Sequence, residues 1–187
     1  MGNVVAMVLM SLMLIIAAYC DIKTKKVPNK LVLPAIVAGW VWWALWGAVG
    51  SDPDLTFWIG LRESFVGFLA GFLPFAAIYA SGALGGGDVK TMAAVGALSA
   101  QWETVLSTTV YACVASLLIA VIVMIKYGIV KQTFARLFGM AMVKASGAKV
   151  EMPDSSPQIP FALAIALGGI LAGLETMIGV KTPWAGF

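Results

Sequence analysis

Residues 3–20 read NVVAMVLMSLMLIIAAYC, a nearly unbroken apolar run that ends against Asp21. A helix needs ~20 mostly apolar residues to cross a bilayer, so this stretch is long enough for one span. A cleaved signal peptide has its basic residues ahead of the apolar run, whereas here they follow it. We therefore expect a first transmembrane helix that remains in the protein. The basic residues in question are Lys23, Lys25, Lys26 and Lys30.

The rest of the chain has the same apolar character. Of its 187 residues, 61% are hydrophobic and 11% are charged, and the mean hydropathy is +0.96. This composition excludes an ordinary soluble domain and predicts an all-α, polytopic membrane protein with one domain over residues 1–187. The fourth of six candidate spans is short and begins at a glycine cluster, so we expect it to be tilted or partly re-entrant. The six candidates are roughly 3–20, 31–49, 58–80, 89–101, 104–125 and 159–180.

The basic residues are distributed unequally between the connections. One set of connections holds ten of the twelve, and the positive-inside rule places that set in the cytoplasm and the N-terminus outside. Asp21 and residues 85–88 then emerge together on the cytoplasmic side of an inner membrane. The long connection over 126–158 has apolar residues at near-helical spacing among basic ones, which predicts a cytoplasmic amphipathic helix on the lipid surface. The ten are Lys23, Lys25, Lys26, Lys30, Lys90, Lys126, Lys131, Arg136, Lys144 and Lys149.

Several kinds of catalytic site are excluded by what the chain lacks. It contains no histidine, which rules out serine or cysteine chemistry driven by histidine. Cys20 and Cys113 both fall in apolar runs and form no CxxC pair, so we interpret them as small buried hydrophobes and expect no metal site. Glu175, in the last span, lies near the outer side, and we interpret it as structural.

Asp21 and Asp88 are the strongest candidates for catalytic residues, because a carboxylate at the edge of a bilayer is costly in free energy without a partner or a function. Asp21 alone is equally well explained as a helix-end residue paired with Lys23 or Lys25 at the interface. Pro28 cannot donate a backbone hydrogen bond and predicts a fixed turn before the second helix. Asn29 is then a candidate N-cap of that helix.

Asp88 ends the sequence Gly85-Gly86-Gly87-Asp88. Three glycines permit positive φ and close approach of another backbone, as an extended peptide substrate would require, although a flexible hinge explains them too. The spacing of a phosphate-binding loop is absent. Lys90 lies two residues further on and cannot face the same way as Asp88 on a helix. We therefore expect Lys90 to be an interfacial or substrate-contacting cation and not a catalytic base.

Three elements together resemble the type IV prepilin peptidases, which are membrane aspartyl proteases of the GxGD type. The elements are Asp21 followed by Val27-Pro28-Asn29, then Gly85-Gly86-Gly87-Asp88-Val89-Lys90, then Ile159-Pro160-Phe161-Ala162. The resemblance implies that the protein removes the basic leader from prepilins or pseudopilins at the cytoplasmic face. It also implies that Asp21 and Asp88 form the catalytic pair. Gly85, Gly86, Gly87, Lys90, Pro28 and Asn29 would shape the site or bind substrate.

The chain departs from larger members of that family in one respect. Many of them carry an inserted zinc-binding domain and also N-methylate the new N-terminus, but only residues 21–30 separate the first two spans here. We therefore expect proteolysis without methylation and without a cofactor. The compact form resembles the peptidases of Flp-type pili, and archaeal preflagellin peptidases are also similar. Prepilins and the lipid bilayer are the expected partners, nucleic acid is not, and the sequence leaves the oligomeric state open.

Two other functions remain as alternatives. Intramembrane aspartates and a glycine-broken helix also suit a transporter that moves ions or couples to protons. Against this, both acids lie at one face of the membrane and no internal repeat is visible. An assembly scaffold with structural acids is the third possibility. In a protease, two neighbouring carboxylates would share one proton, and substitution of either by asparagine would abolish cleavage.

Overall fold

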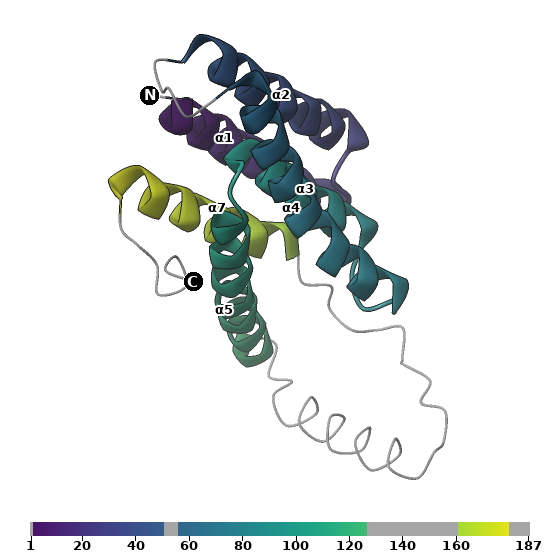
Figure 1. Cartoon of the computed structure of the whole chain (residues 1–187). Helices are drawn as coiled ribbons and strands as arrows, with labels where there is room; N and C mark the ends of the chain where they lie inside the picture. Colours follow the sequence, from purple (N-terminus) through teal and green to yellow (C-terminus); the bar gives the residue numbers. More distant parts are fainter. Residues whose placement is uncertain (1, 51–55, 127–160, 180–187) are drawn as a thin grey trace. The chain divides into compact units, whose positions relative to one another are not determined.

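A computed structural model describes residues 2–50, 56–126 and 161–179 (Figure 1). These residues contain six helices and no strand, which confirms the all-α prediction. The predicted amphipathic helix within 126–158, together with Ile159 and Pro160, lies outside the described residues. The helices are α1 (Gly2–Thr24), α2 (Asn29–Val49), α3 (Phe57–Ala80), α4 (Gly86–Ser99), α5 (Trp102–Lys126) and α7 (Phe161–Ile178).

The chain divides into two compact units by its internal contacts. The first comprises Met1–Ala115 with Pro160–Phe187, and the second comprises Ser116–Ile159. All residues of the candidate site belong to the first unit, which is the one described below. A single peptidase domain over 1–187 stays a prediction.

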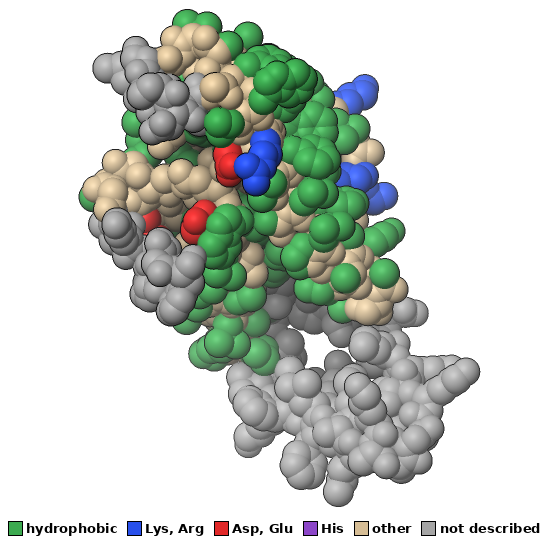
Figure 2. Space-filling model, viewed as in Figure 1, with side chains coloured by type: hydrophobic (Ala, Val, Ile, Leu, Met, Phe, Trp, Pro, Cys, Tyr) green, Lys and Arg blue, Asp and Glu red, His purple; other side chains and the backbone are tan. Residues whose placement is uncertain are grey.

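Five helices are long and apolar enough to cross a membrane: α1, α2, α3, α5 and α7. Hydrophobic side chains cover most of the visible surface of the described residues, as a lipid-facing surface requires (Figure 2). Helix α4 is different, because its 14 residues extend over only about 21 Å, less than the ~30 Å of a hydrocarbon core. The fourth predicted span is therefore a short helix, which begins before residue 89 and ends before residue 101.

Helix α4 is buried among its neighbours along nearly its whole length, from Val89 to Ser99 with Lys90 as the exception. Small residues make this possible. Gly96 of α4 and Gly67 of α3 each face the backbone carbonyl of the other, and a Cβ on Gly39 of α2 would lie 2.6 Å from the carbonyl oxygen of Ala97. Such close backbone contact provides the van der Waals packing that holds helices together in lipid.

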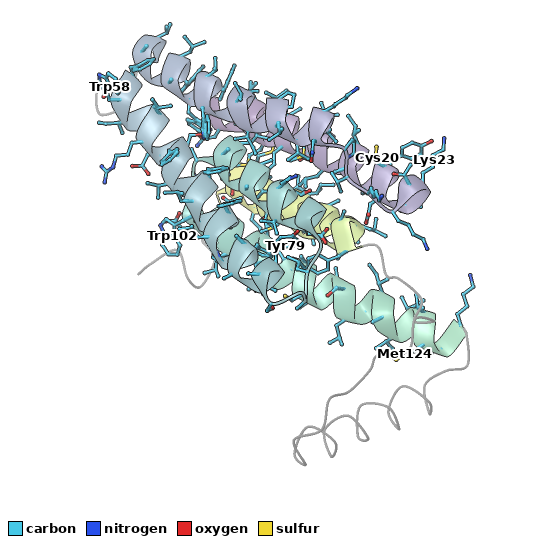
Figure 3. The ribbon with its side chains drawn as sticks, turned by 90° about the vertical axis from the view of Figure 1, so that its right-hand side faces the viewer. Cys20, Lys23, Trp58, Tyr79, Trp102 and Met124 are labelled. Atoms are coloured by element: carbon cyan, nitrogen blue, oxygen red, sulfur yellow. The ribbon has the colours of Figure 1, made fainter. Side chains whose placement is uncertain are left out.

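The ends of the helices fall into two groups. At one end the indole of Trp42 donates to the carbonyl oxygen of Gly2 at 3.3 Å, and that of Trp43 donates to Leu98 at 2.8 Å. The start of α1 and the ends of α2 and α4 therefore meet there. Lys23 and Trp58 lie at opposite ends in Figure 3. The end near Lys23, called the site end here, gathers the end of α1 and the starts of α2, α4 and α7.

Candidate active site

Asp21 lies in the last turn of α1, where Lys25 has a positive φ of 53° and its N–H bonds back to the Asp21 carbonyl at 2.8 Å. This left-handed residue ends the helix. The carboxylate oxygen Oδ2 accepts a hydrogen bond of 3.3 Å from the N–H of Ala162, the second residue of α7. The first N–H groups of a helix lack intrahelical partners and carry partial positive charge. Asp21 therefore caps α7 from another helix.

The alternative pairing of Asp21 with a lysine receives no support from Lys23. The ammonium of Lys23 lies over the ring of Tyr19, 5.8 Å from its centroid. The hydrogen bond from Ala162 and the electrostatic interaction with Asp88 place the starts of α7 and α4 near Asp21 at the end of α1. Asp21 thus lies where two other helices begin.

Asp88 is the third residue of α4, whose N-cap is Gly85. Its carboxylate accepts a hydrogen bond from the backbone N–H of Gly85, which is one half of a capping box. A Cβ on Gly85 would lie 3.1 Å from the Asp88 carboxylate oxygen Oδ2. Glycine at this position therefore leaves room for the carboxylate to reach back over the start of its own helix.

The glycine cluster serves close packing and not unusual backbone geometry. None of its three residues has a positive φ, and Gly85 has φ −78°, so of the two properties that glycine permits the structure uses close approach. An added Cβ on Gly86 would lie 3.4 Å from the ring of Tyr79, and one on Gly87 would lie 3.4 Å from the Cβ of Val27. Both helix α3 and the α1–α2 turn thus lie directly against the start of α4.

The two carboxylates interact electrostatically. Asp88 lies outside the five long apolar helices, and burial raises the pKa of its carboxyl. The negative charge of Asp21 raises this pKa further, to about 6, against the opposing hydrogen bond from Gly85. Asp88 also lies in the first turn of α4, where the partial positive charge of the helix N-terminus acts against this rise. The arrangement favours one ionised and one protonated carboxyl at mildly acidic pH.

The α1–α2 turn, residues 25–28, brings two further predicted site residues next to α4. Pro28, with φ −71° and ψ 132°, occupies the N-cap position of α2, so the prediction of Asn29 as N-cap was wrong. Asn29 is the first helical residue because the extended geometry belongs to Pro28. Its side-chain oxygen Oδ1 accepts a hydrogen bond of 2.9 Å from the Nζ of Lys90. Lys90 is therefore directed at α2 from α4.

Sequence reasoning missed the contact between Asp21 and α7. The sequence predicts no partner for Ala162, which appears only in the third element of the family resemblance. A signal was present, because Pro160 offers neither a side-chain acceptor nor an N–H at the start of that helix. A helix that begins in this way is stabilised when an acceptor from elsewhere in the chain reaches its first N–H groups. Asp21 supplies one.

Glu175, interpreted as structural, has a neutral partner. The hydroxyl of Tyr111 on α5 donates to its carboxyl oxygen Oε1, and Thr104 and Thr176 form a second hydrogen bond between α5 and α7 at 3.4 Å. These contacts lie toward the opposite end of α7 from Ala162. They hold two helices together and do not belong to the candidate site.

Comparison with known proteins identifies the family. A model of the type IV leader peptidase family matches residues 8–121, more than half of the chain. The match includes both Asp21 and Asp88. Among curated proteins and among solved structures, none matches. The chain belongs to the type IV leader peptidase family.

Proposed function

We propose that this leader peptidase is an aspartic endopeptidase with Asp21 and Asp88 as its catalytic pair. The observation that carries the proposal is the position of Asp88, where burial and, second, the charge of Asp21 raise the pKa of its carboxyl to about 6. Two carboxyls that share a proton are the working form of an aspartic protease. The capping of α7 supports Asp21 as the ionised member, and burial supports Asp88 as the protonated member.

The mechanism then follows from these two protonation states. Ionised Asp21 takes a proton from a water molecule, whose oxygen adds to the carbonyl carbon of the scissile peptide bond. Protonated Asp88 donates its proton to the carbonyl oxygen as the tetrahedral intermediate forms. Collapse of that intermediate breaks the C–N bond. The proton held by Asp21 passes to the leaving amine, and the intermediate's hydroxyl proton returns to Asp88.

The proposed substrate is a type IV prepilin or pseudopilin, of the Flp-like class, cut at the cytoplasmic face of the inner membrane. Family membership supports a prepilin as substrate. The concentration of lysine in the connections at the site end supports the cytoplasmic orientation. The short connection from α1 to α2 supports a peptidase without N-methyltransferase activity. Gly85, Gly86, Gly87, Pro28 and Asn29 are proposed to shape the site.

The transporter alternative is not favoured. A transport path would place its acidic groups near the middle of the bilayer, between repeats. Here Asp21 ends one long helix and Asp88 begins a short one, at the same end of the bundle. The family match adds to this argument.

Cleavage of a tagged prepilin in membranes, read as a mobility shift, tests the proposal. Asp21→Asn and Asp88→Asn should each abolish cleavage while the enzyme is present at the wild-type level. Glu103→Gln is a matched control, since Glu103 is an acidic residue in the first turn of α5, away from the site end. The precursor to use is one that the wild-type enzyme cleaves. Processing by either asparagine variant would overturn the two-aspartate mechanism.

A further inference from the structure

We propose that Lys90 is a positioning residue, whose hydrogen bond to Asn29 holds the turn after Asp21 against the helix that carries Asp88. The bond would thereby set the separation of the two carboxyls. This inference rests on the proposed function, because it matters for the reaction only if the two aspartates are its catalytic pair. It replaces the interpretation of Lys90 as a cation that contacts substrate.

The geometry of α4 separates Lys90 from Asp88. Successive helical residues are turned by about 100°, so two residues that are two positions apart point to different sides. The ammonium of Lys90 reaches α2, where it lies 2.9 Å from the side-chain oxygen of Asn29. Asn29 opens α2 directly after the turn that closes α1. The bond therefore links α4, which carries Asp88, to the start of α2, which directly follows the turn after Asp21.

A second contact joins the α1–α2 turn itself to the start of α4. Val27, in the α1–α2 turn, is half-buried against the main apolar core, and its Cβ lies so close to Gly87 that a Cβ added to Gly87 would be 3.4 Å from it. Gly87 immediately precedes Asp88, and Lys90 follows two positions later. The turn is thus held to α4 on both sides of Asp88, by an apolar contact and by a polar one. Two such contacts fix both the distance and the rotation of the turn.

The bond is more important for geometry than for folding. Asn29 is exposed, and an exposed hydrogen bond contributes little to the free energy of unfolding. Variants that lack the bond should therefore fold. A displacement of about 1 Å in a reacting group, by contrast, lowers a rate by as much as about 100-fold. Loss of the bond should therefore lower kcat.

The test measures kcat and KM for cleavage of a prepilin that the wild-type enzyme processes. Lys90→Met removes the donor and keeps the length of the side chain, and Asn29→Leu removes the acceptor. Each should lower kcat by about 10- to 100-fold and leave KM within about twofold. The double variant should be no slower than the slower single variant, because both changes remove the same bond.

Two further variants sharpen the test. Lys90→Arg keeps a charged donor and should recover most of the lost kcat. Lys30→Met is the matched control, because Lys30 is an exposed lysine directly after Asn29 and should leave kcat and KM at their wild-type values. If Lys90→Met gives too little folded enzyme, Asn29→Leu removes the same bond from the other side.

Three results would overturn the inference. A higher KM with unchanged kcat in Lys90→Met would make Lys90 a substrate contact. A fold-loss of kcat in the double variant equal to the product of the two single fold-losses would show that Lys90 and Asn29 act separately. Wild-type kcat per folded molecule in both single variants would show a purely structural bond. If Asp21→Asn and Asp88→Asn are inactive in the same assay, each of these results refutes only the positioning role of Lys90. The proposed function then remains in place.

Discussion

Asp88→Asn should make the folded protein more stable at neutral pH, even as it abolishes cleavage. The carboxyl of Asp88 is half-buried and lies in the field of Asp21, and its pKa is raised from 3.8 to about 6. Ionisation at pH 7 therefore costs more in the folded state than in the unfolded state. Asparagine has nearly the same shape, keeps an oxygen that accepts from Gly85, and carries no charge.

The magnitude follows from the pKa. Each pKa unit between folded and unfolded states is worth about 1.4 kcal/mol, so a rise from 3.8 to about 6 corresponds to at most about 3 kcal/mol. Because the carboxyl of Asp88 is still partly exposed, solvent screening reduces the expected gain to about 1–2 kcal/mol. For a chain of this length, that gain raises the thermal midpoint by about 2–8 °C.

The sign depends on pH in a defined way. The folded-state pKa of Asp88 lies above the unfolded value, so the stability of the protonated form is fully present below pH 3.8 and is lost as pH rises through about 6. Wild type and Asp88→Asn should therefore have similar thermal midpoints near pH 4 and should differ near pH 8. Thermal unfolding of both proteins in the same detergent measures this difference.

Glu103→Gln serves as the control for loss of a carboxylate in the first turn of a helix, and it should show no such gain at high pH. Equal midpoint differences between wild type and Asp88→Asn near pH 4 and near pH 8 would refute the electrostatic reasoning. A lower midpoint for Asp88→Asn near pH 8 would refute it as well, because the ionised carboxylate would then stabilise the start of α4 more than burial and Asp21 destabilise it.

Three further predictions concern activity and packing. The kcat/KM for prepilin cleavage should fall about tenfold per pH unit above about pH 6, as Asp88 loses the shared proton, and a profile flat to about pH 9 would contradict the shared-proton mechanism. Gly96→Ala sets a Cβ against the carbonyl oxygen of Gly67 and should destabilise the protein by at least about 3 kcal/mol, measured as a lower thermal midpoint; an unchanged midpoint would mean that α3 and α4 separate freely. Tyr111→Phe should cost about 1–3 kcal/mol by leaving the Glu175 carboxyl without its donor, whereas Glu175→Gln keeps the acceptor and should cost less. A thermal midpoint of Tyr111→Phe equal to that of wild type would show that the bond contributes nothing.

Much of the fold was predictable because it depends on local properties of the sequence. A segment that crosses lipid must form all its backbone hydrogen bonds internally, so each apolar run of sufficient length predicts a helix. The run 3–20 became α1 (Gly2–Thr24), and 31–49 became α2 (Asn29–Val49). Helices extend past their apolar runs because polar residues continue the backbone hydrogen bonds into the interface. Asp21 consequently lies within the last turn of α1 and not beyond it.

The details of the site were less predictable because they depend on contacts between distant residues. The partner of Asp21 is a backbone N–H 141 residues away, and no local pattern specifies that pair. Asparagine is a favoured N-cap residue, yet the N-cap of α2 lies one residue earlier, at Pro28, whose φ is fixed by its ring. The three glycines suggested unusual backbone angles, whereas their function lies in the small space they leave for Val27 and Tyr79.

The short length of α4 connects the fold to the proposed chemistry. A helix long enough to span the bilayer would carry its N-terminus out to the interface, where water would solvate Asp88 and leave its pKa low. The 14 residues of α4 contact α1, α2, α3 and α7, and Asp88 is half-buried at the start of this short helix. Burial and Asp21 favour the protonated form of Asp88, while the N-terminus of α7 stabilises the charge on Asp21. The unequal pair that an aspartic mechanism needs thus arises from helix length and helix ends. For this reason a change that lengthens α4 or shifts the start of α7 should impair cleavage without touching either aspartate.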